Sequence, residues 1–161
     1  MWILRTFMLL ALIVWIGGII FFAFVLAPTL FAVLPAQLAG NVVSPSLTKL
    51  HWIGLFAGAV FLICSLVYNW QKYSQLRLFS ATHVFVVLML ALTAVSQFTI
   101  TPRMRELRTQ LSTIHDASQI DTRRTEFDRL HAWSTRTEGA VLLLGLALVI
   151  LTARRVEEGS R

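Results

Sequence analysis

Four polar residues stand out in an apolar chain because their side chains could bind a metal, a haem or a proton. His131, Ser134 and Glu138 are spaced i, i+3 and i+7, so a helix would place them on one face. If the apolar stretches cross a membrane four times, His51 lies on the same side as His131. Imidazole and carboxylate groups suit copper, zinc or iron, and two histidines from different helices can hold a haem iron.

The same residues also have a simpler interpretation as helix-packing hydrogen bonds. Polar side chains commonly bond a neighbouring membrane helix, and a buried histidine beside a carboxylate could instead relay protons. These alternatives stay open, so His51, His131, Ser134 and Glu138 are candidate ligands of an unassigned cofactor, with haem and copper the two to test. His83 belongs to the opposite face of the membrane and cannot join them.

No residue is predicted to be catalytic. The sequence contains no HExxH, CxxC, glycine-rich phosphate loop or serine-hydrolase nucleophile elbow. Its one cysteine, Cys64, cannot form an intramolecular disulfide and is expected to be a small buried hydrophobe. The four methionines form no cluster, which gives copper handling little support.

The composition requires lipid as part of the solvent. Hydrophobic residues make up 57% of the chain and charged residues 14%, with a mean hydropathy of +0.72. Soluble chains have about 45–50% apolar and about 25% charged residues. The net charge of +6 does not indicate nucleic-acid binding, because the basic residues occupy the polar gaps between apolar stretches, where they would meet lipid headgroups.

Four apolar stretches are each long enough to cross a hydrocarbon core of about 30 Å, which needs about 20 helical residues. They cover approximately residues 7–27, 51–70, 78–100 and 134–153. The first is longer than the apolar region of a secretory signal, and Pro28 follows where cleavage would be needed, so it is expected to stay as a helix. Trp52, Trp70 and Trp133 fall near the expected ends, as interfacial anchors do. The sequence therefore predicts an all-α, four-helix transmembrane bundle, a single domain over residues 1–161.

The distribution of basic residues does not assign an orientation in the membrane. With four spans, both termini lie on the same side of the membrane. Six of the 14 Lys and Arg residues lie on that side and eight on the other. The positive-inside rule counts Lys and Arg near the ends of the spans. A division this even does not choose between the two orientations.

Two long connections lie on the same side of the expected bundle. Residues 28–50 are too apolar for a solvated loop and contain three prolines, which predicts a short helix on the membrane surface or, alternatively, a re-entrant piece. In residues 101–133, Met104, Leu107 and Leu111 recur at helical spacing among arginines. The third and fourth spans are therefore expected to continue past the bilayer as a helical hairpin, whose charged face is either solvated or a docking surface.

Two groups of residues form motifs. The first comprises Trp15, Gly17-Gly18, Phe21-Phe22, Pro28 and Gly40, and its glycine pair is expected to allow close helix packing. The second comprises Pro102 and the Phe-x-x-Leu-His-x-x-Ser element formed by Phe127, Leu130, His131 and Ser134. Together these motifs resemble the transmembrane-protein-205-like family of uncharacterised four-span membrane proteins over about residues 10–152. That family usually continues the second element with Asn, where this chain has Glu138.

The resemblance implies a four-helix membrane domain of undetermined activity. More distantly, the chain looks like the copper-resistance-protein-D-like superfamily, which includes a haem-dependent protoporphyrinogen oxidase. The leading prediction is a non-enzymatic, multi-pass protein of the bacterial inner membrane that binds or helps move a small ligand, or supports a homo-oligomer or larger membrane complex. A haem-binding membrane oxidoreductase and a copper or other metal transport component are the alternatives.

Overall fold

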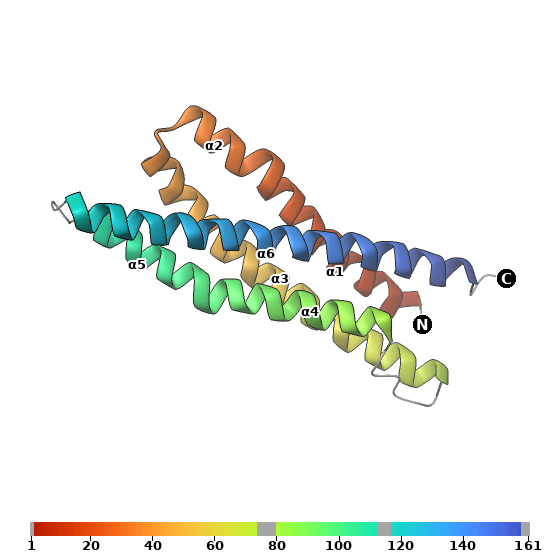
Figure 1. Cartoon of the computed structure of the whole chain (residues 1–161). Coiled ribbons are helices and arrows are strands. Elements are labelled where there is room, and N and C mark those ends of the chain that lie inside the picture. The colour runs from red at the N-terminus through yellow and green to blue at the C-terminus, as the bar shows by residue number, and fades with distance from the viewer. Residues whose placement is uncertain (1, 74–79, 113–116, 159–161) are drawn as a thin grey trace.

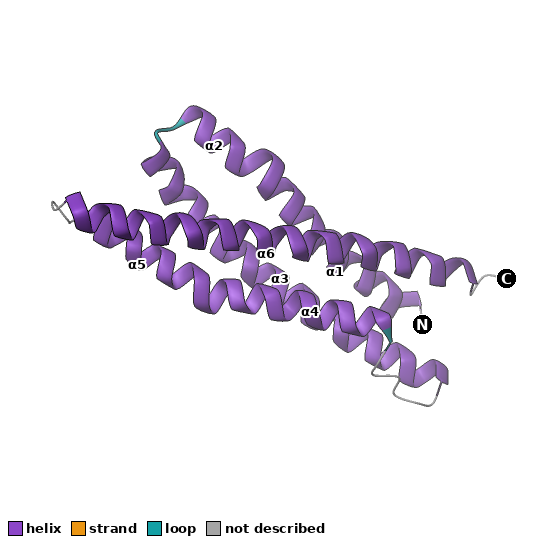
Figure 2. Ribbon diagram, viewed as in Figure 1, coloured by secondary structure: helices purple, strands orange, loops and turns teal. Residues whose placement is uncertain are grey.

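The residues that the structure describes form four long helical rods, as the computed structural model shows (Figures 1 and 2). The structure describes residues 2–73, 80–112 and 117–158. In chain order the elements are α1 (Trp2–Phe21), the π-helical turn η1 (Phe22–Leu26), α2 (Ala27–Val33), α3 (Ala36–Tyr73), α4 (Ala81–Val95), the π-helical turn η2 (Ser96–Ile100), α5 (Thr101–Leu111) and α6 (Ala117–Glu158). All four rods are long and apolar enough to cross a membrane. The described ranges contain no strand, and the prediction of an all-α bundle is confirmed.

The prediction of a separate surface helix or re-entrant piece in residues 28–50 is wrong. α2 continues α1 through η1, and α3 begins at Ala36, so only Leu34 and Pro35 separate the first two rods. Pro28 lies at the start of α2, directly after the π-helical turn η1, and a local π-helical adjustment of this kind lets a membrane helix continue past a proline. Pro45 lies inside α3, and the helix continues through it.

The prediction that the third and fourth spans extend as a helical hairpin is confirmed. α4, η2 and α5 form one continuous rod, with Pro102 in the first turn of α5. α5 packs against the first part of α6. Residues 78–79 of the expected third span lie outside the described residues, as does most of the short connection before it.

Small residues on α3 allow α1 to approach closely. A Cβ at Gly58 would lie 2.5 Å from Cζ3 of the Trp15 ring, and one at Gly54 would overlap the same ring. Trp15 is 2% exposed, so its indole fills a groove that only glycines leave open. This packing joins α1 and α3 to a core that includes Leu12, Ile16, Phe61, Met89 and Leu148.

Exposed tryptophans mark two levels along the bundle. Trp52 and Trp70 of α3 are both largely exposed, and a helix between them rises about 27 Å at about 1.5 Å per residue. That rise is close to a hydrocarbon core of about 30 Å. Trp133 of α6 is also exposed, and α6 continues beyond it as an apolar stretch to Thr152. Tryptophan favours the membrane interface, so α5 and the first part of α6 extend beyond the hydrocarbon.

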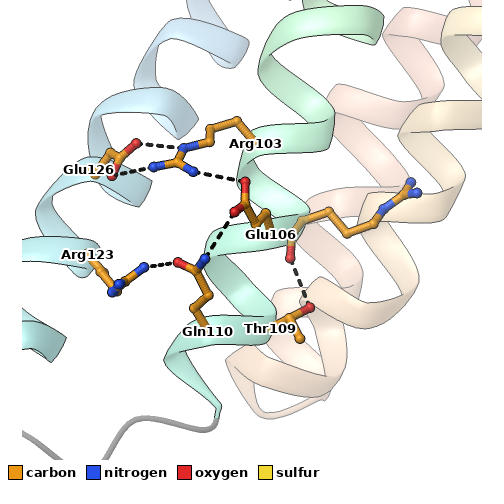
Figure 3. A network of polar contacts seen from close by, with 7 residues as sticks. Arg103, Glu106, Thr109, Gln110, Arg123 and Glu126 are labelled. Atoms are coloured by element: carbon orange, nitrogen blue, oxygen red, sulfur yellow. Dashed lines mark hydrogen bonds and ion pairs between the residues drawn. The ribbon is translucent and has the colours of Figure 1, made fainter.

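Charged side chains link α5 to α6 in this extension (Figure 3). Arg103 donates from Nε to Glu126 at 2.9 Å and from Nη1 to Glu106 at 2.9 Å. Gln110 donates to Glu106 at 3.0 Å and accepts a hydrogen bond from Arg123. The network shows why this part of the sequence can be helical yet charged: its polar groups pair across the two helices in water.

The Arg103–Glu126 contact should make the stability of this hairpin depend weakly on pH. The hydrogen bond from Arg103 lowers the pKa of the Glu126 carboxyl below its ordinary value. A carboxyl with a lowered folded-state pKa stabilises the fold at neutral pH, and this contribution is lost as the pH falls through that pKa. We expect Glu126→Gln to lower the Tm slightly at neutral pH, because the pair is exposed and solvent-screened.

The test compares thermal unfolding of the two proteins across a pH series. The difference in Tm between wild type and Glu126→Gln should shrink as the pH falls from about 7 to about 3. Asp128→Asn, which changes an exposed acid on the same helix, is the matched control and should show no such trend. A difference in Tm that is constant with pH would contradict the assigned role of the Glu126 charge.

Candidate functional site

His51 of α3 is the centre of a buried polar contact among three helical rods. Its imidazole is 2% exposed. Nδ1 lies 2.9 Å from Oε1 of Gln97 in η2, and Nε2 lies 2.5 Å from Oε1 of Glu138 in α6. Both ring nitrogens are therefore hydrogen-bonded, each to a side chain from a different rod. We refer to His51, Gln97 and Glu138 as the polar triad.

The geometry fixes where the protons of the polar triad can lie. The side-chain carbonyl of Gln97 accepts a hydrogen bond, so Nδ1 of His51 carries a proton. One further proton lies between Nε2 and the Glu138 carboxylate. It can belong to the histidine, which gives an imidazolium–carboxylate pair, or to the glutamic acid, which gives a neutral pair. The triad is electrically neutral in both arrangements, which suits an apolar environment.

The π-helical turn η2 carries Gln97 to this position. A π-turn inserts one extra residue into a helix and so changes which side chains face the neighbouring helices, and such turns are frequent at functional sites. Gln97 is 8% exposed, whereas the next residue, Phe98, is exposed and packs edge-on against Trp52 at 5.8 Å between ring centroids. Because Trp52 is an interfacial residue, the triad lies near one edge of the hydrocarbon.

The structure brings together two of the four candidate ligands and separates a third from them. His51 and Glu138 are in contact. His131 is exposed and stacks on Phe127 at 6.4 Å between ring centroids. It lies seven residues before Glu138, about 10 Å along the helix axis. Ser134 is buried on α6, and its predicted part in cofactor binding stays a prediction.

The described side chains do not form a ready-made metal centre. Within residues whose side chains the structure describes, no three His, Cys, Asp or Glu groups gather closely enough to hold a metal ion. His51 and Glu138 supply two donors, and Gln97 adds a neutral amide oxygen. To ligate a haem iron, His51 would have to break one of its two hydrogen bonds, either that of Nε2 to Glu138 or that of Nδ1 to Gln97. The triad as it stands is better arranged to hold a proton than a transition metal.

A second buried histidine lies at the other end of the bundle. His83 is 3% exposed and is hydrogen-bonded through Nε2 to Ser65 at 2.9 Å and through Nδ1 to Ser80 at 3.0 Å. Ser80 caps the first turn of α4. These contacts join α3 to α4, and they lie on α3 fourteen residues from His51, about 21 Å along the axis. His83 is separate from the polar triad, as the sequence predicted.

The motif glycines have different surroundings. A Cβ at Gly18 would lie 2.8 Å from Leu50, whereas one at Gly17 would meet nothing within 4 Å. Gly40 accepts a hydrogen bond from Nη1 of Arg108 at 2.6 Å, and a Cβ there would lie 3.1 Å from the guanidinium. The close packing expected of the glycine pair is therefore found at Gly18 but not at Gly17, which faces open space, whereas Gly40 packs against the Arg108 side chain.

Sequence reasoning missed Gln97 as a partner of His51. Gln97 was recognisable as one of two strongly polar side chains in the third apolar stretch, the other being His83. Its spacing could not show that it faces His51, because η2 shifts the helical register at that point. Gly54 and Gly58 were also missed, although their small-xxx-small spacing is a signal for helix packing.

The four rods and the polar triad among them define a multi-pass integral membrane protein. Residues 10–112 match the model of a family described as a domain of unknown function, DUF4149. The match covers more than half of the 161 residues, so the chain belongs to this family. It includes His51 and Gln97 and ends before Glu138. No curated protein and no solved structure matches the chain.

Proposed function

We propose that this protein is a non-enzymatic membrane subunit that binds a small ligand at the polar triad, alone or as part of a larger membrane complex. The observation that supports this function is the burial of His51 with both ring nitrogens bonded to side chains of other rods. Ionisable residues within membrane bundles are costly and mark ligand, ion or proton sites. Because three of the four rods meet at this point, a ligand that binds there would contact all three.

The position of the triad favours exchange with the aqueous phase. Glu138 is the most accessible member, with 16% of its side chain exposed. It lies near the level of Trp52 and Trp133, where the hydrocarbon ends. The simplest ligand is a small polar molecule that replaces one of the two hydrogen bonds of His51.

The haem and metal alternatives receive less support from the same contacts. Among the histidines that the structure describes, two ligands to one haem at this end of the bundle would have to be His51 and His131, and His131 is exposed and stacked on Phe127. A transport component for copper would need further donors near the His51–Glu138 pair. Membership of the transmembrane-protein-205-like family, a bacterial inner-membrane location and a homo-oligomeric state are also parts of this proposal.

Spectroscopy and mass spectrometry of the detergent-purified protein test the proposal. We expect a colourless protein without stoichiometric metal, and a small molecule in its solvent extract that is absent or several-fold depleted in Glu138→Gln. Asp128→Asn, an exposed change on the same helix, should retain the molecule.

Two results would overturn the small-ligand proposal. A Soret band that disappears in His51→Ala would establish the haem alternative. Copper or zinc at one equivalent, lost in the same variant, would establish the metal alternative.

A further inference from the structure

Arg108 of α5 is a partly buried cation that joins three of the rods. Its Nη1 donates a hydrogen bond to the backbone carbonyl of Gly40 in α3 at 2.6 Å. Its Cζ lies 5.7 Å from the centroid of the Phe127 ring in α6. A Cβ at position 40 would lie 3.1 Å from Nη2, so glycine at that position lets the guanidinium approach the α3 backbone. These two contacts hold the guanidinium in one place between α3 and α6.

The guanidinium of Arg108 has no carboxylate partner among the residues that the structure describes. Every ion pair in that part of the chain belongs to His51 or Arg103. Arg103 is more exposed than Arg108, yet it pairs with both Glu106 and Glu126 (Figure 3). A guanidinium has five N–H donors, and the hydrogen bond to α3 uses one of those on Arg108. Because a charge removed from water is costly without a counter-charge, the partly buried cation is the one that most needs an anion.

A second unpaired arginine lies beside it on the same helix. Arg105 also extends toward α3, where it donates from Nη2 to Oγ1 of Thr48 at 3.3 Å. Residues three apart are neighbours on a helix surface, so the like charges of Arg105 and Arg108 repel each other. α3 cannot compensate them, because the chain contains no acidic residue before Glu106. An anion bound at this surface would offset both the repulsion and the missing counter-charge.

The contact between Arg108 and Gly40 lies in water, beyond the lipid headgroups. Gly40 precedes Trp52 on α3 by 12 residues, which corresponds to about 18 Å along the helix axis. The headgroup layer extends only about 5–8 Å beyond the hydrocarbon on each side. An anion that binds at Arg108 therefore comes from the aqueous phase.

We propose that Arg108, assisted by Arg105, binds a small oxyanion of the phosphate class from the aqueous phase. A planar guanidinium can donate to two oxygens of a phosphate group at once. Gly40 and Phe127 already hold this guanidinium in place, so little conformational freedom is lost on binding. The site is separate from the polar triad, because Gln97 precedes Arg108 by 11 residues, about 16 Å along the rod.

Binding of radiolabelled inorganic phosphate to the full-length protein tests the proposal. Equilibrium dialysis is carried out in an uncharged detergent, with the ionic strength held constant by chloride. The wild type should show a single saturable phosphate site per chain. Arg108→Gln should lower the affinity by about tenfold or more, because hydrogen bonds to a charged group are lost. Arg105→Gln should lower it by a smaller factor, and it gives a second reading if Arg108→Gln does not fold.

Two variants serve as matched controls. Arg124→Gln removes an exposed arginine of α6, and Glu138→Gln changes the polar triad. Both should bind phosphate as the wild type does. Absence of saturable binding to the wild type would overturn the proposal, and so would an equal loss in Arg124→Gln, which would show that net charge alone attracts phosphate. A phospholipid that copurifies with the wild type but not with Arg108→Gln would also overturn it, because the anion would then be a lipid headgroup.

Discussion

Glu138→Leu should destabilise the protein by about 2–3 kcal/mol, because it leaves Nε2 of buried His51 without a partner in apolar surroundings. This loss of stability is at the lower end of the range for breaking a buried ion pair, because 16% of the Glu138 side chain is exposed. His51→Leu should lower the free energy of unfolding by a similar amount, because it leaves Glu138 and Gln97 without their hydrogen-bond partner. Thermal unfolding in detergent micelles, followed by tryptophan fluorescence, measures both effects.

The double variant separates a specific contact from general intolerance of the site. If His51 and Glu138 act as a pair, the double leucine variant should be more stable than the sum of the single effects predicts, by about 1 kcal/mol or more. Glu138→Gln, which can keep a hydrogen bond to His51, should recover part of the loss. Asp128→Leu on the exposed face of α6 should change stability by less than about 0.5 kcal/mol. Additive single effects would contradict the pairing.

Gly58→Ala should destabilise the bundle by about 1–3 kcal/mol, the usual range for overpacking a well-packed interior. The added Cβ would lie 2.5 Å from the Trp15 ring. Trp15 is almost completely buried, and the same Cβ would also lie 2.6 Å from Cδ2 of Leu90. The same assay measures this effect, together with the yield of folded protein in the membrane fraction.

Two other glycines provide matched controls for the Gly58 substitution. A Cβ at Gly17 or Gly139 would meet no other atom within 4 Å, so alanine there should be neutral or stabilising by up to about 1 kcal/mol through helix propensity. Combining Gly58→Ala with Trp15→Leu should cost less than the sum of the two single changes, because the smaller side chain makes room. Equal losses at Gly17 and Gly58 would show that helix propensity or expression, rather than contact with Trp15, governs the result.

The sequence alone determined the class of fold. Four apolar stretches in a chain with 14% charged residues leave few alternatives to membrane-spanning helices, because an unpaired backbone is too costly in lipid. Helical spacing of Met104, Leu107 and Leu111 also predicted the hairpin beyond the third span. These features are local: they depend on composition and on periodicity within one segment.

Proline misled the sequence reasoning in residues 28–50. The three prolines suggested short separate pieces, but Pro28 falls in a helical first turn and Pro45 lies within a continuous helix. Only Pro35 coincides with a break, next to the extended Leu34. The effect of a proline depends on its position in a helix, and that position is known only once the helices α2 and α3 are seen in the folded protein.

Only the tertiary structure decided which polar residues meet. Spacing placed His131, Ser134 and Glu138 on one face, but it could not say which of them faces His51. The contact of Glu138 with His51, the exposure of His131 and the approach of Gln97 through η2 all depend on how separate helices are packed and rotated. Such contacts join residues 46 and 87 positions apart, and the helical period of any one segment carries no information about them.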